Sequence, residues 1–140
     1  ASCALGPFIR LFDGAFTLET VSNADIALIV EGEDNYRLEG KSSMSRISRS
    51  PANIAAQTAG AHHQYPDGFV LFCGTMFAPT DDRDGKGMGF SHKLGDVVTI
   101  ATPSLGRLVN RVRLSTQCAP WSFGAGALMR NLAARGYLRG

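Results

Sequence analysis

The clearest pattern in the sequence is an alternation of apolar and polar positions between residues 25 and 41. Residues 26–30 carry apolar side chains on both faces of a segment with a period of two, which is typical of a buried strand. Turn-forming residues then occupy positions 32–35, and the alternation resumes over 36–39. We therefore predict a β-hairpin over residues 25–41.

Several other segments are predicted to be strands. Phe69–Cys73 is a continuous apolar run between turns, the pattern of a strand that is buried on both sides. If Phe72 is buried there, its replacement by alanine should cost about 3–5 kcal/mol. Residues 96–102 and 106–114 have the same apolar character, and residues 8–11 form a shorter candidate strand after a Gly-Pro turn.

Two segments carry the signals of helices. Ser50 is a good N-cap, and Pro51 suits the first helical position because its missing N–H costs nothing there. The apolar face of this predicted helix continues to Tyr65. Residues 125–133 repeat apolar side chains at helical spacing, and Gly136 follows where a helix end favours a positive φ.

The order of these elements predicts the fold class. Strands do not alternate regularly with helices, so we expect an α+β protein with a strand-rich, mixed β-sheet core and two helices. A single helical turn is expected near residues 17–22. Residues 74–89 form a long loop rich in Gly, Asp and Pro, and loops of this length are usually functional.

The composition supports one folded unit and excludes several classes of protein. The chain has 140 residues, 44% hydrophobic and 19% charged, with a net charge of +2. This balance predicts neither a nucleic-acid partner nor a membrane surface. No apolar run approaches the roughly 18 residues that a membrane span needs. The three cysteines lack CxxC spacing, which favours a reducing compartment, and we predict a cytoplasmic protein.

The acidic, glycine-rich part of the long loop raises the possibility of a calcium site. If Asp82 is the first position of an EF-hand loop, positions five and twelve fall on Lys86 and Lys93, where the ion requires oxygen ligands. The flanking helices are also missing. The alternating glycines that follow do not match a nucleotide-binding motif. We therefore predict no metal site in this loop.

Five blocks of residues, taken in order, resemble the C-terminal part of the catalytic domain of the fumarylacetoacetate hydrolase family. They are a Leu-Gly-Pro block followed by an aromatic residue, a hairpin followed by a Ser-Met segment, a Pro-containing helix start, an apolar strand ending in Gly-Thr, and a final glycine-rich block. In this sequence they correspond to residues 3–9, 30–44, 51 onward, 69–75 and 87–112, the last with Gly87–Phe90, Gly95–Val98 and Gly106–Val112.

The resemblance implies an enzyme that acts on 2-oxo or β-dicarbonyl acids by C–C bond hydrolysis, decarboxylation or isomerisation. A bound Mg²⁺ or Mn²⁺ ion would chelate the oxo-acid and stabilise its enolate. By the same resemblance, Gly74 and Thr75 would be substrate-binding residues, with Thr75 contacting the substrate carboxylate. We expect Gly74 to allow close approach of the backbone.

The resemblance also implies what this chain lacks. The family's Glu-x-Glu pair, its metal-binding Asp and the following Lys all precede the Leu-Gly-Pro block. We therefore expect residues 1–140 to be the C-terminal portion of such a domain, with no catalytic residue assigned, no metal ligand and no cofactor of its own. Glu31 and Glu33 form another Glu-x-Glu, which we interpret as hairpin surface.

Other functions remain open at this point. Family members are dimers, so a homodimer is the expected assembly. A second hypothesis is a non-catalytic binding or oligomerisation module on the same β-rich scaffold. A third is an enzyme that uses Cys73 as a nucleophile, which would need a nearby histidine.

Overall fold

A computed structural model of the chain describes residues 4–75 and 77–138. These residues form two compact units. The larger unit, residues 5–112, contains the whole β-sheet and the candidate site. The smaller unit consists of Ala4 with residues 113–138, and it contains the C-terminal helix.

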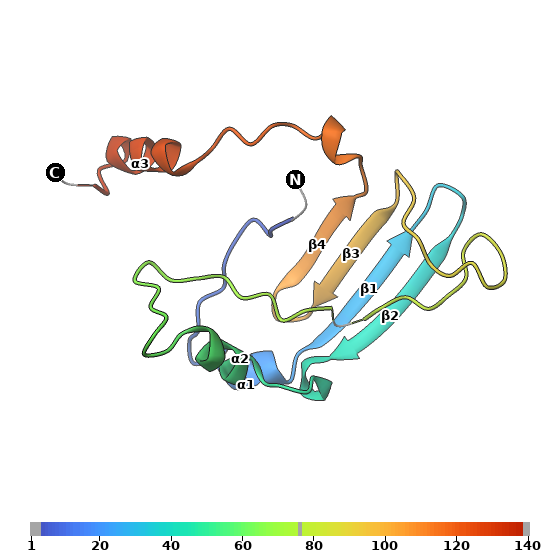
Figure 1. Ribbon diagram of the computed structural model, residues 1–140, viewed down its shortest axis with the longest axis horizontal. Coiled ribbons are helices and arrows are strands. Elements are labelled where there is room, and N and C mark those ends of the chain that lie inside the picture. Colours follow the sequence, from blue (N-terminus) through green and yellow to red (C-terminus); the bar gives the residue numbers. More distant parts are fainter. Residues whose placement is uncertain (1–3, 76, 139–140) are drawn as a thin grey trace. The chain divides into compact units, whose positions relative to one another are not determined.

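The larger unit is built on one four-stranded sheet with the strand order β2-β1-β3-β4 (Figure 1). All three pairings are antiparallel, so the expectation of a mixed sheet is wrong. The predicted hairpin at 25–41 is confirmed, and residues 97–111 form a second one. Strands joined by a tight turn run in opposite directions, which makes both outer pairings antiparallel. The strands are β1 Asp25–Glu31, β2 Arg37–Ser43, β3 Val97–Thr102 and β4 Gly106–Arg111.

The described residues contain three α-helices where two were expected, because the predicted helical turn is itself a short helix. Thr17 caps it, accepting a hydrogen bond from the Thr20 backbone N–H. Ser50 caps the second helix in the same way, with Pro51 in its first turn, as predicted. The helices are α1 Leu18–Ser22, α2 Pro51–Thr58 and α3 Ala125–Ala134, with 3₁₀ turns η1 Met44–Arg46 and η2 Ser115–Gln117.

Helix α2 is shorter than its apolar face predicted. It ends at Thr58, and Gly60 then forms an isolated antiparallel bridge with His63. A glycine at this point lowers helix propensity, and the bridge takes its backbone hydrogen bonds. The end of α3 follows the prediction, since Gly136 has a φ of 75°.

Phe69–Cys73 is not a strand, which corrects the strongest of the apolar-run predictions. Val70 and Phe72 are 74% and 68% exposed, so neither belongs to the core. Phe69 instead packs against Tyr65, with ring centroids 5.1 Å apart. Residues 8–11 are not a strand either. An apolar run becomes a strand only where a sheet edge pairs with its backbone.

The buried core is small and lies at the β1–β2 hairpin. Val30 and Leu38 are directly paired across the two strands and are 0% and 2% exposed. Phe16 and Met44 are the other apolar residues buried to this degree within the described chain. None of the described helices has the length and apolar character needed to cross a membrane.

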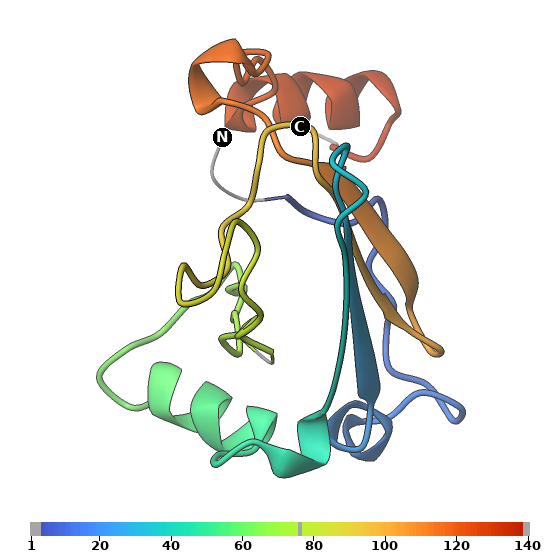
Figure 2. The ribbon, with the colours of Figure 1, turned by 90° about the vertical axis from the view of Figure 1, so that its right-hand side faces the viewer.

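The connection from β2 to β3 positions the site. Residues 59–75 and 77–95 run along one side of the sheet, as the view in Figure 2 shows. The Phe77 ring packs directly on Gly40 of β2, where an added Cβ would lie 2.5 Å from it. Gly40 therefore leaves the space that the ring occupies.

Replacing Leu38 by alanine should lower the free energy of unfolding by about 2–5 kcal/mol, because this side chain is fully packed. The exposed Phe72 offers the contrast: Phe72→Ala should cost less than about 1 kcal/mol. Urea-induced unfolding followed by circular dichroism measures both. Equal losses in the two variants would show that Phe72 is a core residue after all.

Candidate functional site

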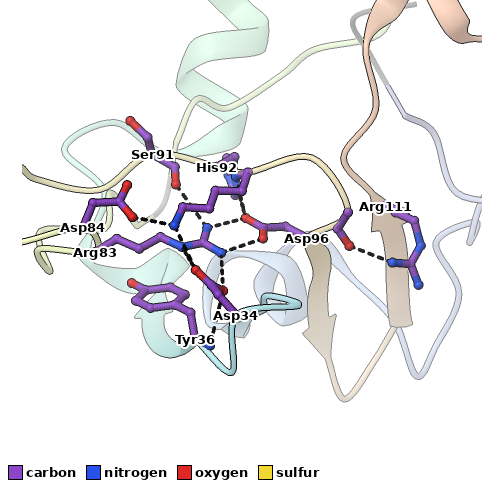
Figure 3. Close-up of polar contacts among 10 residues, drawn as sticks. Asp34, Tyr36, Arg83, Asp84, Ser91, His92, Asp96 and Arg111 are labelled. Atoms are coloured by element: carbon purple, nitrogen blue, oxygen red, sulfur yellow. Dashed lines mark hydrogen bonds and ion pairs between the residues drawn. The ribbon is translucent and has the colours of Figure 1, made fainter.

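A buried arginine fixes the long loop to the sheet. The side chain of Arg83 is 1% exposed and makes a two-pronged ion pair with Asp96, at 2.6 and 2.8 Å. It also donates to Asp34 in the β1–β2 turn at 2.9 Å. Lys93 contacts Asp34 at 3.0 Å and forms a further ion pair with Asp84. We call these five residues the Arg83 network (Figure 3).

The network is almost saturated with hydrogen bonds. Asp96 is fully buried and also accepts from the backbone N–H of Lys93, at 2.9 Å. Arg83 donates once more to the carbonyl of Ser91 at 3.1 Å. Its guanidinium lies over the ring of Tyr36, 4.4 Å from the centroid, which adds a cation–π contact. Burial of these charges is tolerated because each is paired and hydrogen-bonded.

The pKa values in the network favour the charged forms. The hydrogen bonds from Arg83 hold the pKa of Asp96 at about 2, against an ordinary value of 3.8, although burial opposes this. Arg83 and Lys93 lower the pKa of Asp34 in the same way. The two cations have raised pKa values, caused chiefly by Asp96 for Arg83 and by Asp84 for Lys93. The network therefore stays ionised at neutral pH.

The acidic loop uses its carboxylates internally. Asp82 accepts hydrogen bonds from the backbone N–H groups of Gly87 and Gly89, at 2.6 and 2.7 Å, and so closes the turn on itself. Asp84 is held by Lys93. Among residues 4–75 and 77–138, no group of three or more His, Cys, Asp or Glu side chains is arranged to hold a metal ion.

The two residues expected to bind substrate lie in an exposed, irregular segment. Gly74 and Thr75 are both exposed, and Gly74 has a φ of 86°. Beyond the adjacent residues, no atom lies within 4 Å of a Cβ added at Gly74, so the expected close approach of the backbone is not seen. A glycine is favoured at this position because of its positive φ. Thr75 makes no hydrogen bond to another described residue. Phe77, two residues on, anchors this segment to Gly40.

The other residues singled out from the sequence fall in separate places. Glu31 pairs with Arg37 at 2.5 Å on the exposed surface of the hairpin, and Glu33 is 77% exposed, as interpreted. Cys73 is exposed and forms no hydrogen bond to any described histidine. The Cys73 nucleophile hypothesis therefore gains no support from this geometry.

Arg83 and Asp34 were not predicted from the sequence to be partners. They are 49 positions apart, and each stands among residues that are typical of ordinary turns. The local sequence pointed to this network only through Asp96, which directly precedes an apolar strand in the Gly-Asp-Val-Val block. A carboxylate at the start of a buried strand requires a partner, but no pattern in the sequence says which cation supplies it.

Comparisons of this chain with models of protein families, with curated proteins and with solved structures find no match. The resemblance to the fumarylacetoacetate hydrolase family therefore depends on the residues quoted above.

Replacing Arg83 by methionine should lower the free energy of unfolding by about 3–5 kcal/mol, because it leaves Asp96 buried without its partner. Arg37 is a matched control, since it also joins two carboxylates but is half exposed. Arg37→Met should cost less than about 1 kcal/mol. Chemical unfolding of both variants measures the difference, and similar losses would mean that the Arg83 network contributes no more than a surface ion pair.

The stability of the protein should fall as the pH drops from about 5 to 2. Asp96 binds its proton near pH 3.8 when unfolded but only near 2 when folded, so acid favours the unfolded chain. The loss from Asp96 is about 2 kcal/mol, at 1.36 kcal/mol for each pKa unit. Unfolding titrations at several pH values measure it. An Asp96→Asn variant should have a shallower acid dependence, and an unchanged slope would contradict the assignment.

Proposed function

We propose that this chain is the C-terminal part of the catalytic domain of a metal-dependent enzyme that acts on 2-oxo or β-dicarbonyl acids, in the manner of the fumarylacetoacetate hydrolase family. Its role in that domain is to present a substrate-binding threonine on a segment that is anchored to the sheet. The reaction would be hydrolysis of a C–C bond, decarboxylation or isomerisation, at a site completed by other residues.

The observation that carries this proposal is the anchored, exposed Gly74-Thr75 segment. Phe77, two residues after Thr75, packs on Gly40, and the Arg83 network fixes the loop further along the chain. The Thr75 hydroxyl is exposed and has no described partner. A hydroxyl with these properties is suited to donate a hydrogen bond to a substrate carboxylate, and donors to charged groups contribute about 1.5–3 kcal/mol.

The motif blocks gain a physical role from the Arg83 network. The Asp of the Gly-Asp-Val-Val block is Asp96, which binds Arg83 from the long loop. The block therefore does more than begin strand β3, because it fixes the loop that follows Thr75. This dependence supports the reading of these motifs as parts of one site.

The metal ion of such an enzyme does not fit the carboxylates of the Arg83 network. Asp34, Asp84 and Asp96 are each paired with Arg83 or Lys93, and those cations would repel a divalent ion. When bound, Mg²⁺ or Mn²⁺ would stabilise the enolate of an oxo-acid. Its ligands would have to come from carboxylates outside this network, and what the present residues do is bind and orient the substrate carboxylate.

The test compares this chain with a longer chain that also carries the residues encoded upstream in the same reading frame. With Mg²⁺ and either oxaloacetate or an acylpyruvate, the 140-residue chain alone should give no turnover above the background of free metal. The longer chain should turn over at least one of them. In it, Thr75→Val should raise KM about tenfold or more, because a hydrogen bond to a charged group is lost.

Thr80 provides the control, since it is also exposed and lies in the same loop. Thr80→Val should leave KM unchanged within about twofold, well under one tenfold step of 1.4 kcal/mol. Metal-dependent turnover by the 140-residue chain alone would contradict the proposal. So would an upstream sequence without a Glu-x-Glu motif.

A second candidate function is a non-catalytic assembly module, favoured by the exposed apolar side chains of the larger unit. Val70 and Phe72, two positions apart in one segment, are 74% and 68% exposed. Exposed apolar side chains that gather in one patch often meet another surface. Light scattering tests whether this chain forms a homodimer. A dimer that stays inactive together with an inactive longer chain would favour the module.

A further inference from the structure

A second candidate site lies on the other face of the sheet. Because paired residues of an antiparallel sheet share a face, Ala27, Lys41, Ala101 and Arg107 lie on the face opposite to Gly40. They line a groove of about 760 Å³. It lies at the end of the sheet where β1 and β4 begin and β2 and β3 end, and Figure 1 shows these strand ends. Pockets for small molecules are typically about 300–1,000 Å³.

The charges around this groove are unbalanced. Three cations line it: Lys41 from β2, Arg46 from η1 and Arg107 from β4, together with one carboxylate, Asp25 of β1. Within the described part of the chain, these four side chains form no ion pair or hydrogen bond. We call them, with the apolar floor of Ala27, Ala101 and Pro103, the basic groove. Its formal charge is +2.

The opposite end of the same face is different. There Arg37 is paired with Glu31 at 2.5 Å and with Glu39 at 2.6 Å. Arg111 donates to the carbonyl of Gly95 at 2.7 Å and lies 3.6 Å from Glu33. The cations at one end of this face are therefore bound by groups of the protein itself, whereas those at the other end have no described partner. On an ordinary solvated face we would expect no such difference between the two ends.

We propose that the basic groove binds a small dianion that carries an apolar body, such as a dicarboxylate or a phosphate monoester. The net charge of +2 matches two negative charges, and Arg46 and Arg107 can each present a planar pair of N–H donors to a carboxylate or phosphate. Ala27, Ala101 and Pro103 contact the apolar body. This site is separate from Thr75, and it does not depend on the function proposed above.

Binding is measured with the intact 140-residue chain by ¹⁵N-resolved NMR titration at pH 8, with phthalate and with phenyl phosphate as probes. Each should give saturable shifts at the amides of the groove, with a dissociation constant below about 1 mM. Binding by only one probe identifies the anion as carboxylate or phosphate. Raising the salt concentration should weaken binding, since exposed charges are screened.

Two substitutions test the assignment, and a third controls for net charge. Arg107→Gln and Lys41→Gln should each weaken binding about tenfold or more, because a charged hydrogen bond is lost. Arg37→Gln removes the same charge from the same face but from a paired residue, so the affinity should change less than about twofold, a small part of one tenfold step. All three side chains are exposed, and their variants should unfold like the parent chain.

Several outcomes would overturn this inference. They are the absence of saturable shifts, an equal loss of affinity in Arg37→Gln, or equal binding of the neutral benzyl alcohol. Inorganic phosphate binding as tightly as phenyl phosphate would remove the role of the apolar floor. A concentration-dependent increase in mass that Arg107→Gln abolishes, without binding of either probe, would show that a second copy of the chain occupies the groove.

Discussion

Arg83 is a permanent cation whose side chain is almost completely removed from water, and two carboxylates from distant parts of the chain neutralise it. One lies in the turn of the first hairpin and the other directly before the third strand. A buried charge that loses its partner is strongly destabilising, so this contact specifies a single position for the loop. The Gly74-Thr75 segment takes its position from that loop and from the Phe77 ring. The position of Thr75 thus depends on an ion pair that forms further along the chain.

Local features of the sequence predicted local structure well. The hairpin at 25–41, the Ser50-Pro51 helix start and the helix end at Gly136 are all set by neighbouring residues, through alternation, capping and backbone freedom. The prediction of a strand over Phe69–Cys73 was wrong for a different reason. Its apolar run indicates a need for burial, but forming a strand also requires a free sheet edge in the right place. The described chain offers no such pairing to these residues.

The candidate site was only partly predictable. Gly74 and Thr75 were singled out through the resemblance, because this Gly-Thr pair matches the one that the family places after an apolar strand. Arg83 and Asp34 could not, since they meet only when the long loop folds against the β1–β2 turn. The basic groove could not either, since its side chains are brought together by strand pairing. Lys93 was counted against a calcium site in the acidic loop, but its contacts with Asp34 and Asp84 could not be predicted from the sequence. The sequence does not show which opposite charges far apart in the chain will meet, because only the folded structure brings them together.

The separation of Asp34 from Arg83 along the chain has a consequence for the order of assembly. The two hairpins need only short-range closure, whereas Arg83 must bring together groups 49 positions before it and 13 after it. The entropy of closing such a loop is repaid only when both carboxylates already stand in place. We therefore expect the sheet to form first and the loop to lock last. By the same reasoning the loop is the unit that opens most easily, so Thr75 belongs to a segment that can detach and return while the sheet beneath it stays folded.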